Sequence, residues 1–272
     1  MGSIPEDGVK QSAPCPTTGQ TLIENDLEGR LALITGRQEG LSIAQSLFAE
    51  GVSLALTYWT NKASLEGLVD GLTTKERGQK VSLHHIDVSS QSDLERLFEE
   101  IEQGYGRRPD ILISNAGYGK RISDIMDIPI EEFDKMIRIN LRPSFILSKL
   151  AVPHMVSQGW GRIIFVTSIA AIGGGINGCH YAASKAGLTG LMKNLSSKLA
   201  KDGVTVNDVS PAMIGDTGMI PDAKMLAGTA GDPKNIPVGR LGTPQECANV
   251  VNMLCKTGYL TGQSILLAGG LR

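Results

Sequence analysis

The sequence has no long apolar run and no excess of charge of either sign. Its apolar stretches fall well short of the roughly 18 residues that a helix needs to cross a bilayer, so we expect no membrane segment. The 26 basic and 28 acidic residues give a net charge of -2 without a basic run, so nucleic acid is not an expected partner. Residues 1–26 lack the apolar centre of a signal peptide. We therefore expect a soluble, cytoplasmic protein.

Cysteine is scarce and scattered. Cys15, Cys179, Cys247 and Cys255 show no metal-type spacing. The sequence therefore predicts no metal site, and free thiols are the simplest state in a reducing compartment. Cys179 precedes Tyr181 by two residues, so it either lines a pocket or, as we favour, fills space as a small side chain.

The order of apolar segments favours one α/β domain. A chain of 272 residues can bury one substantial core. Residues 1–26 are polar without an apolar period, which predicts a flexible arm before a single domain over residues 27–272. In that domain, short apolar strands alternate with helical patterns, as in parallel βαβ units. We predict a doubly wound, mostly parallel seven-stranded sheet of the Rossmann type, with helices on both faces.

The pattern also places the individual elements. Strands are expected at 31–35, Val52–Tyr58, Val81–Ile86, Asp110–Asn115, Arg162–Ser168, Val204–Ser210 and Ser264–Leu267. Helices are expected at Ile43–Glu50, from Lys62, at Ser89–Gln103, at Ile128–Met155 with a bend near Pro143, from Cys179 and at Pro244–Lys256. The segment at about 212–240 is irregular.

A loop with glycines separates the first strand from the first helix. It runs from Thr35 to Ser42 and contains Gly36 and Gly40. Backbone N–H groups and the dipole at a helix start can hold a pyrophosphate, so the loop is a candidate cofactor site. Two glycines also fit an ordinary tight turn, and it is the position before a helix that favours binding.

A second pattern surrounds Tyr181. An apolar strand ends at Ser168, and Tyr181 and Lys185 follow on a predicted helix. Residues four apart share one helix face, so the phenol and the ammonium point into the same space. A cation within about 4–6 Å lowers the pKa of a phenol from its usual value near 10, which suits a proton donor. Alone, the pair also fits a solvated helix surface.

Taken in order, these motifs resemble those of the classical short-chain dehydrogenase/reductase family. After the glycine loop come Asn115-Ala116-Gly117, Asn140, Ser168, Tyr181 and Lys185. The resemblance covers the whole predicted domain. It implies one fold, a nicotinamide cofactor and a set of catalytic residues.

The resemblance implies a role for each catalytic candidate. In the family, a hydride moves from C4 of a nicotinamide to a carbonyl carbon, and Tyr181 would give a proton to the carbonyl oxygen. Lys185 would lower the tyrosine pKa and bind the nicotinamide ribose, and Ser168 would orient the carbonyl. Asn140 would hold a water that relays protons, or would only satisfy the bonds of a broken helix.

The resemblance also assigns cofactor contacts. They are expected from Gly36, Arg37, Gly40, Leu41, Tyr58, Asn61, Lys62, Asp87, Val88, Asn115, Ala116, Gly117, Tyr181, Lys185, Pro211, Ile214 and Thr217. For Asp87, a helix-capping role is the alternative or an additional role. Thr217 lies one residue beyond the family's threonine position, which Asp216 occupies.

Three positions depart from the family pattern. Ser42 replaces the third glycine of the loop, Ala212 replaces the glycine after Pro211, and Ala268 replaces an aspartate near the C-terminus. A serine at position 42 either crowds the cofactor or caps the helix. We expect weakened, not abolished, cofactor binding.

The choice of dinucleotide depends on the residues after the second strand. No acid lies at 52–61, where it would bind the ribose diol of NAD. Arg37 and Lys62 offer cations to a 2'-phosphate, so NADP(H) is favoured over NAD(H). Against this, Glu39 would repel that phosphate, and Lys62 could equally be a solvated lysine at a helix start.

We expect NAD(P)H-dependent reduction of a ketone to an alcohol. The irregular segment 212–240 is rich in methionine, isoleucine and leucine, and such an adaptable apolar lid suits an apolar or polycyclic small-molecule carbonyl substrate, as in secondary metabolism. The alternative is a non-redox member of the same fold, an isomerase, lyase or cyclase acting on a reactive intermediate. Ser42 and Ala212 favour the alternative, whereas the retained catalytic candidates favour redox chemistry.

Self-association is the last expectation from the sequence. The long helices that begin near Ile128 and Cys179 carry apolar residues on more faces than one sheet can cover. By the resemblance they pair across a two-fold axis. We expect a homodimer or homotetramer.

Overall fold

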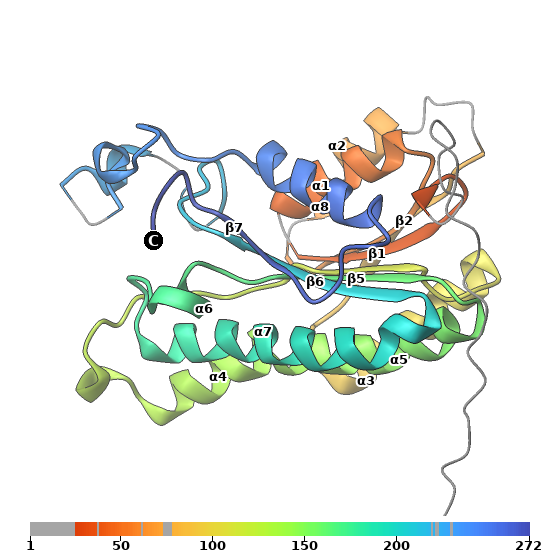
Figure 1. Cartoon of the computed structure of the whole chain (residues 1–272), viewed down its shortest axis with the longest axis horizontal. Coiled ribbons are helices and arrows are strands. Elements are labelled where there is room, and N and C mark those ends of the chain that lie inside the picture. Colours follow the sequence, from red (N-terminus) through yellow and green to blue (C-terminus); the bar gives the residue numbers. More distant parts are fainter. Residues whose placement is uncertain are drawn as a thin grey trace, which may run out of the picture.

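The computed structural model describes residues 25–36, 38–60, 62–72, 78–218, 220, 223–228 and 231–272. They form a seven-stranded sheet with helices on both faces, in one domain (Figure 1). The predicted arm over 1–26 lies almost entirely outside the described residues, as do Arg37 and Asn61.

The seven predicted strands are confirmed. They are β1 (Leu31–Thr35), β2 (Ser53–Tyr58), β3 (Val81–His85), β4 (Ile111–Ser114), β5 (Gly161–Val166), β6 (Val204–Pro211) and β7 (Ser264–Leu267). Their order is β3-β2-β1-β4-β5-β6-β7, and every neighbouring pair is parallel. Strands β1 and β4 are buried along their whole length, which explains why their sequences are continuous apolar runs.

Helices cover both faces of the sheet. One face carries α1 (Gln38–Ala49), α2 (Lys62–Leu72) and α8 (Pro244–Cys255), and the other carries α3 (Gln91–Tyr105), α4 (Ile130–Asn140), α5 (Arg142–Ser157) and α7 (Cys179–Leu199), as Figure 1 shows. On α3, burial follows the helical period of the apolar residues. The buried side chains are Leu94, Leu97, Phe98 and Ile101. Each face of the sheet therefore has its own apolar core.

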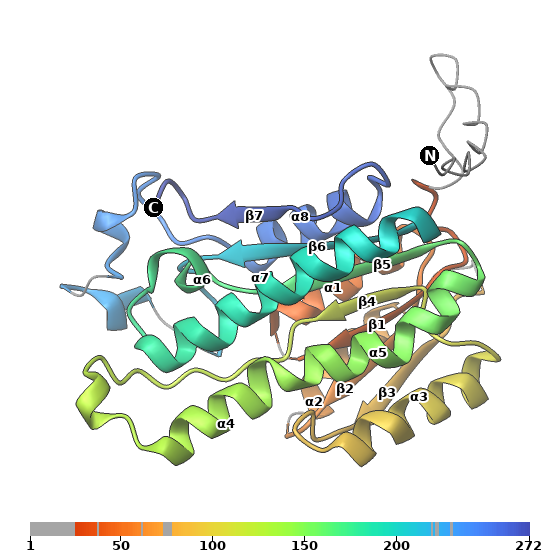
Figure 2. The ribbon, with the colours of Figure 1, turned by 60° about the horizontal axis from the view of Figure 1, so that its bottom comes forward.

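The switch in strand order lies between β1 and β4. Strands to one side of β1 connect in one direction and those from β4 onward in the other. A crevice forms at such a switch point, beyond the carboxyl ends of the strands. Figure 2 shows all arrowheads at the same end, where the start of α4 and the segment after β6 extend past the sheet.

The predicted helix over Ile128–Met155 is two helices. Helix α4 ends at Asn140 and α5 begins at Arg142, so the break lies at Leu141, close to the predicted bend. Pro143 is in the first turn of α5, where its missing N–H costs nothing, whereas inside one continuous helix its ring would clash with the carbonyl four residues before it. The break leaves Asn140 at the end of α4.

Two boundaries differ from the predictions in ways that matter for the site. Helix α1 begins at Gln38, not at Ile43, so Ser42 lies inside the helix and cannot cap it. The segment after β6 is irregular as expected, with the short 3-10 helices η4 (Ala223–Leu226) and η5 (Pro233–Asn235). The remaining short helices are η2 (Ile125–Asp127), α6 (Ala170–Gly173) and η3 (Ala200–Asp202).

Candidate active site

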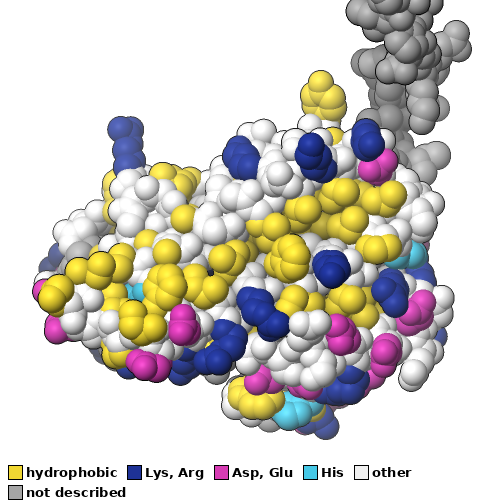
Figure 3. Space-filling view, turned by 90° about the horizontal axis from the view of Figure 1, so that it is seen from below, with side chains coloured by type: hydrophobic (Ala, Val, Ile, Leu, Met, Phe, Trp, Pro, Cys, Tyr) yellow, Lys and Arg dark blue, Asp and Glu magenta, His cyan; other side chains and the backbone are white. Residues whose placement is uncertain are grey.

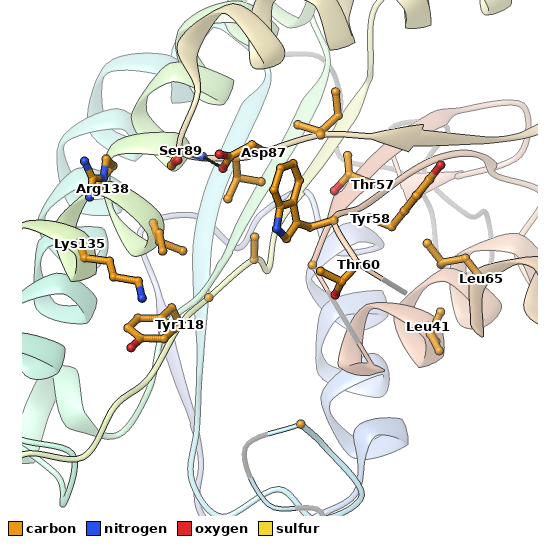
Figure 4. Close-up of a pocket in the computed structure, with 18 residues that line it drawn as sticks. Leu41, Thr57, Tyr58, Thr60, Leu65, Asp87, Ser89, Tyr118, Lys135 and Arg138 are labelled. Atoms are coloured by element: carbon orange, nitrogen blue, oxygen red, sulfur yellow. Dashed lines mark hydrogen bonds between the residues drawn. The ribbon is translucent and has the colours of Figure 1, made fainter. Parts of the chain in front are cut away.

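A cleft of about 680 Å³ opens at the carboxyl ends of β1, β2, β3 and β4 (Figure 4). It is lined by Gly36, Leu41, Thr57, Tyr58, Trp59, Thr60, Leu65, Ile86, Asp87, Val88, Ser89, Ala116, Gly117, Tyr118, Lys135, Arg138, Ile139 and Gly218. Seven predicted cofactor contacts are in this set, and they come from four different strand ends. The topology thus brings together residues that are far apart in the chain.

The turn before α1 packs closely against the loop after β4. Gly36 has φ +103°, and a Cβ there would lie 2.6 Å from Asn115 Nδ2 and 2.8 Å from the backbone N of Ala116. Thr35 Oγ1 accepts hydrogen bonds from the backbone N–H groups of Asn115 and Ala116, at 3.2 Å each. These bonds fix the start of the Asn-Ala-Gly motif against the end of β1.

Asn115 presents a donor beside this turn. Its Nδ2 is buried and, among the described residues, has no hydrogen-bond partner. A Cβ on Gly40, in the first turn of α1, would lie 3.2 Å from that nitrogen. A buried amide donor next to a glycine turn and a helix N-terminus is the donor set that a pyrophosphate requires, so the residues present fit a dinucleotide.

Asn140 connects the loop after β4 to α7. Its Oδ1 accepts from the backbone N–H of Tyr118 at 2.7 Å, and its Nδ2 donates to the Tyr118 carbonyl at 2.9 Å and to Ser184 Oγ at 3.0 Å. With 1% exposure, Asn140 is buried. It therefore satisfies both backbone groups of Tyr118 in a position that the helix break opens.

Lys185 lies between the end of β5 and Tyr181. Its Nζ donates to the Val166 carbonyl at 2.8 Å and lies 5.9 Å from the centre of the Tyr181 ring. Both side chains are buried, at 3% and 5% exposure. A Cβ on Gly117 would lie 3.4 Å from the same Nζ, so the ammonium also borders the cleft.

Ser168 follows β5 by two residues. Its Oγ accepts from the backbone N–H of Ala170 at 3.2 Å, at the start of α6. Ala170 and Tyr181 belong to one small apolar cluster with Met136, which places Ser168 beside the helix that carries the tyrosine. The structure thus gathers the four catalytic candidates from the end of β5, α7 and the end of α4.

The buried carboxylate of Asp208 hydrogen-bonds residues close to Ser168 and Lys185. Asp208 on β6 accepts from Thr167 Oγ1 at 3.0 Å and from Thr189 Oγ1 at 3.1 Å. Thr167 directly precedes Ser168, and Thr189 lies one helical turn after Lys185. Asp208 therefore ties the two catalytic elements, β5 and α7, to the same strand.

Several predicted contacts lie elsewhere. Lys62 does not line the cleft: it is more than half exposed and pairs with Glu66 at 2.8 Å, and a hydrogen bond to Glu66 raises the Lys62 pKa. Thr217 is buried, and its Oγ1 donates to the Ile214 carbonyl at 3.1 Å, within its own loop. From that loop, Gly218 reaches the cleft.

The positions that depart from the family pattern have local roles. Ser42 is half-buried inside α1. Ala212 is buried, and its N–H donates to the Leu267 carbonyl at 2.9 Å, which continues the pairing of β6 with β7. Ala268 is also buried.

The cleft residues that were not predicted include Trp59, Lys135 and Arg138. Trp59 follows β2 and stacks on His85, with ring centres 5.1 Å apart and planes 4° from parallel. Lys135 and Arg138 are on the face of α4 that also presents Ile139, at helical spacings of three and four. That spacing, with Asn140 next along the helix, was the signal available in the sequence.

The described part of the chain has neither a metal-binding cluster nor a helix that could span a membrane. It contains no group of three or more histidine, cysteine, aspartate or glutamate side chains that could hold a metal ion. None of its helices is long and apolar enough to cross a membrane.

Known proteins share both the sequence and this geometry. A family model described as enoyl-(acyl carrier protein) reductase matches residues 40–272. The 3-oxoacyl-[acyl-carrier-protein] reductase FabG of Thermotoga maritima is 33% identical over 253 residues, covering 90% of this chain and 98% of that protein. Dehydrogenase/reductase SDR family member 4 of Bos taurus is 32% identical over 250 residues, covering 90% and 88%.

Solved structures agree. A short-chain dehydrogenase/reductase from Serratia marcescens superposes with a TM-score of 0.80 at 32% identity, covering 90% of this chain and 98% of that one. The region that the family model matches includes all four catalytic candidates and the cleft residues other than Gly36. This chain belongs to the short-chain dehydrogenase/reductase family of oxidoreductases.

Proposed function

We propose that the protein is an NADP(H)-dependent reductase that converts a ketone to an alcohol. The observation that carries this proposal is the position of Lys185, whose ammonium lies next to the Tyr181 ring, the Val166 carbonyl and Gly117 at the cleft. A buried cation beside a buried phenol favours the phenolate, which makes the tyrosine an effective proton donor and acceptor near neutral pH.

The dinucleotide would be held by the turn before α1 and by the strand ends. Gly36 and Gly40 let the turn pack closely on Asn115, backbone N–H groups at the start of α1 would bind the pyrophosphate, and Asn115 Nδ2 would add a donor. Asp87 and Val88 line the cleft and would contact the adenine. When bound, the nicotinamide supplies a hydride to the carbonyl carbon.

The residues of the chain manage the proton and the carbonyl. Tyr181 donates its phenolic proton to the carbonyl oxygen, and Ser168 Oγ donates a hydrogen bond to the same oxygen. Lys185 stabilises the phenolate that remains. Asn140 keeps the end of α4 open beside Ser184, where a proton path to Lys185 can form. Such general acid catalysis contributes about 10²- to 10⁴-fold.

The substrate proposal rests on the segment after β6 and on the relatives. The segment brings Ile214 and Leu226 to the same end of the sheet as the cleft, and we propose that it acts as a lid over an apolar ketone. Two of the relatives are reductases of 3-oxoacyl groups on a carrier protein, and such a group is a ketone. A small apolar or polycyclic ketone of secondary metabolism and an acyl thioester are both reasonable test substrates.

The proposal extends to assembly and location. Figure 3 shows apolar side chains gathered across the face formed by the helices below the sheet. Exposed apolar residues on this face include Phe133 on α4, with Phe145 and Val156 on α5. We propose that this face pairs with a second copy, giving a dimer or tetramer in the cytoplasm.

A non-redox reaction on the same fold is the second candidate. The observation that favours it is Ser42, which places a side chain where the family has its third glycine. The test is NADPH oxidation, followed at 340 nm, with a panel of ketones that includes a polycyclic ketone and a 3-oxoacyl thioester. Ketone-dependent oxidation with equimolar alcohol supports the reductase; conversion of a ketone without NADPH oxidation would favour the second candidate.

A further inference from the structure

Two basic side chains of α4 form one wall of the cleft. Lys135 and Arg138 are the lysine and arginine among the described lining residues, and Asp87 is the acid. The two are three residues apart, so they share a helix face. Figure 4 shows both on the α4 side, across the cleft from Thr60 and Leu65.

Nearby carboxylates do not cancel these charges. Among the residues that the structure describes, no carboxylate forms an ion pair with Lys135 or Arg138. The Lys135 Nζ lies 4.3 Å from the centre of the Tyr118 ring, which holds it at the cleft. Asp87 Oδ1 accepts from the backbone N–H of Ser89 at 2.8 Å.

The α4 acid that interacts with Lys135 is already engaged. Glu132 pairs with Lys120 at 3.3 Å. Desolvation raises the Glu132 pKa, but hydrogen bonds from Tyr118 and Lys120 and nearby positive charge outweigh it and lower that pKa overall. Glu132 is therefore a carboxylate paired with Lys120. Lys135 adds to the positive charge around it without forming an ion pair, so the Lys135 ammonium remains available to a ligand.

Of the two cations predicted for a phosphate, Arg37 lies outside the described residues and Lys62 is not in this position. Lys62 pairs with Glu66 outside the cleft lining, so the described basic side chains that line the cleft come from α4 and not from α2. The pyrophosphate position, at the start of α1, lies by Gly36 and Leu41 and is served by backbone groups. The α4 wall thus offers a second place for a negative charge.

We propose that Lys135 and Arg138 form an anion subsite that binds a phosphate or carboxylate group of a ligand in the cleft. The proposal rests on the function proposed above, because it takes the cleft to hold a cofactor and a ketone. Two sources share this chemistry: the 2'-phosphate of the cofactor and an acidic group on the substrate. In both cases the subsite selects the charged ligand over its neutral analogue.

The experiment compares two double variants. Lys135→Met with Arg138→Met removes the subsite. Lys198→Met with Lys201→Met is the matched control, because these exposed lysines are also three residues apart but lie at the far end of α7 from Tyr181. Circular dichroism checks that both variants are folded.

The readouts separate the two sources and do not all need turnover. Quenching of tryptophan fluorescence reports binding of NADPH and NADH, because Trp59 lines the cleft while Trp160 is buried. Steady-state kinetics with 4-oxopentanoate and its methyl ester report the substrate side. A loss of about 5-fold or more in affinity for NADPH but not NADH supports the cofactor source, and an equal rise in KM for the acid but not the ester supports the substrate source.

Other outcomes overturn the subsite. It is wrong if the α4 variant changes neither NADPH affinity nor the KM of the acid, or changes them no more than the α7 control does. The proposed function is tested separately: binding of NADPH that depends on the α4 pair, without oxidation of NADPH by any ketone, would leave the subsite standing and remove the reductase.

Discussion

The side chain of Asn140 forms hydrogen bonds with both backbone groups of Tyr118. Its Oδ1 accepts from the N–H at 2.7 Å, and its Nδ2 donates to the carbonyl at 2.9 Å. This pairing joins the end of α4 to the loop that borders the cleft. The helix break itself follows from Pro143, which lies in the first turn of α5 and could not stand inside one continuous helix without a clash.

Asn140→Ala is expected to destabilise the protein and to lower turnover. The substitution leaves the two Tyr118 backbone groups without their partner. An unsatisfied buried group costs roughly 1–3 kcal/mol, and these two groups are partly buried, so the cost per group is toward the lower end. Ser184→Ala removes one partner of the Asn140 amide and should cost less. Urea unfolding should give the highest free energy of unfolding for wild type, a lower one for Ser184→Ala and the lowest for Asn140→Ala. Equal stability of wild type and Asn140→Ala would contradict this order.

Tyr181→Phe should remove proton donation and keep the fold. The ring is buried in an apolar cluster, so loss of the hydroxyl leaves the packing intact while turnover falls by about 10²- to 10⁴-fold. The measurement is ketone-dependent NADPH oxidation by the folded variant. Turnover near the wild-type value would show that another group donates the proton.

NADPH should bind, and more tightly than NADH, despite Ser42. The backbone donors at the start of α1 are retained, and a steric cost of about 1–3 kcal/mol weakens binding by roughly 5- to 150-fold. Ser42→Gly should therefore tighten binding. Ser42→Ala removes the hydroxyl but keeps the Cβ, so comparison of the two variants separates the effect of the hydroxyl from that of the side-chain bulk. The measurement is the dissociation constant of NADPH and of NADH for each protein, obtained by titration calorimetry. No binding below a millimolar by wild type, with recovery in Ser42→Gly, would end the redox proposal.

Light scattering at micromolar concentration should give the mass of a dimer or tetramer. The reason is the apolar face over α4, α5 and α7 (Figure 3), which a monomer would leave in water. Phe145→Glu places a charge on this face and should shift the mass toward the monomer. A monomeric mass for the wild type would refute the assembly.

Stability should fall in acid partly through Glu246. Arg240 donates two hydrogen bonds to this carboxylate, at 2.9 and 2.8 Å, and with the backbone N–H of Thr243 lowers the Glu246 pKa to about 2. Because the folded pKa lies below the unfolded value of about 4.3, the stabilisation is present above that pH and is lost as the pH falls toward 2. The pair is partly exposed, so the contribution is small.

The check is the difference in unfolding free energy between wild type and Glu246→Gln. It should be positive at pH 6 and shrink as the pH approaches 2. Glu99→Gln, on the exposed side of α3, is the control. A difference that stays constant over this range would show that the ion pair is not responsible.

The sequence alone determined the fold and the order of the motifs. Strands such as β1 and β4 are buried on both faces, so their residues must be continuously apolar, and this pattern is local. The spacing of Tyr181 and Lys185 on one helix face is equally local, and so is the effect of Pro143 on the helix before it. Each of these properties depends only on neighbours in the chain.

Tertiary structure decided which side chains reach the cleft. Lys62 was expected there but pairs with Glu66, whereas Lys135 and Arg138 enter from a helix more than 70 residues further along. Sequence patterns describe faces of single helices, and they do not say which face meets a strand end from another part of the chain. The bond from Lys185 to the Val166 carbonyl exists because packing of α7 on the sheet places the two groups together, and burial then makes it favourable.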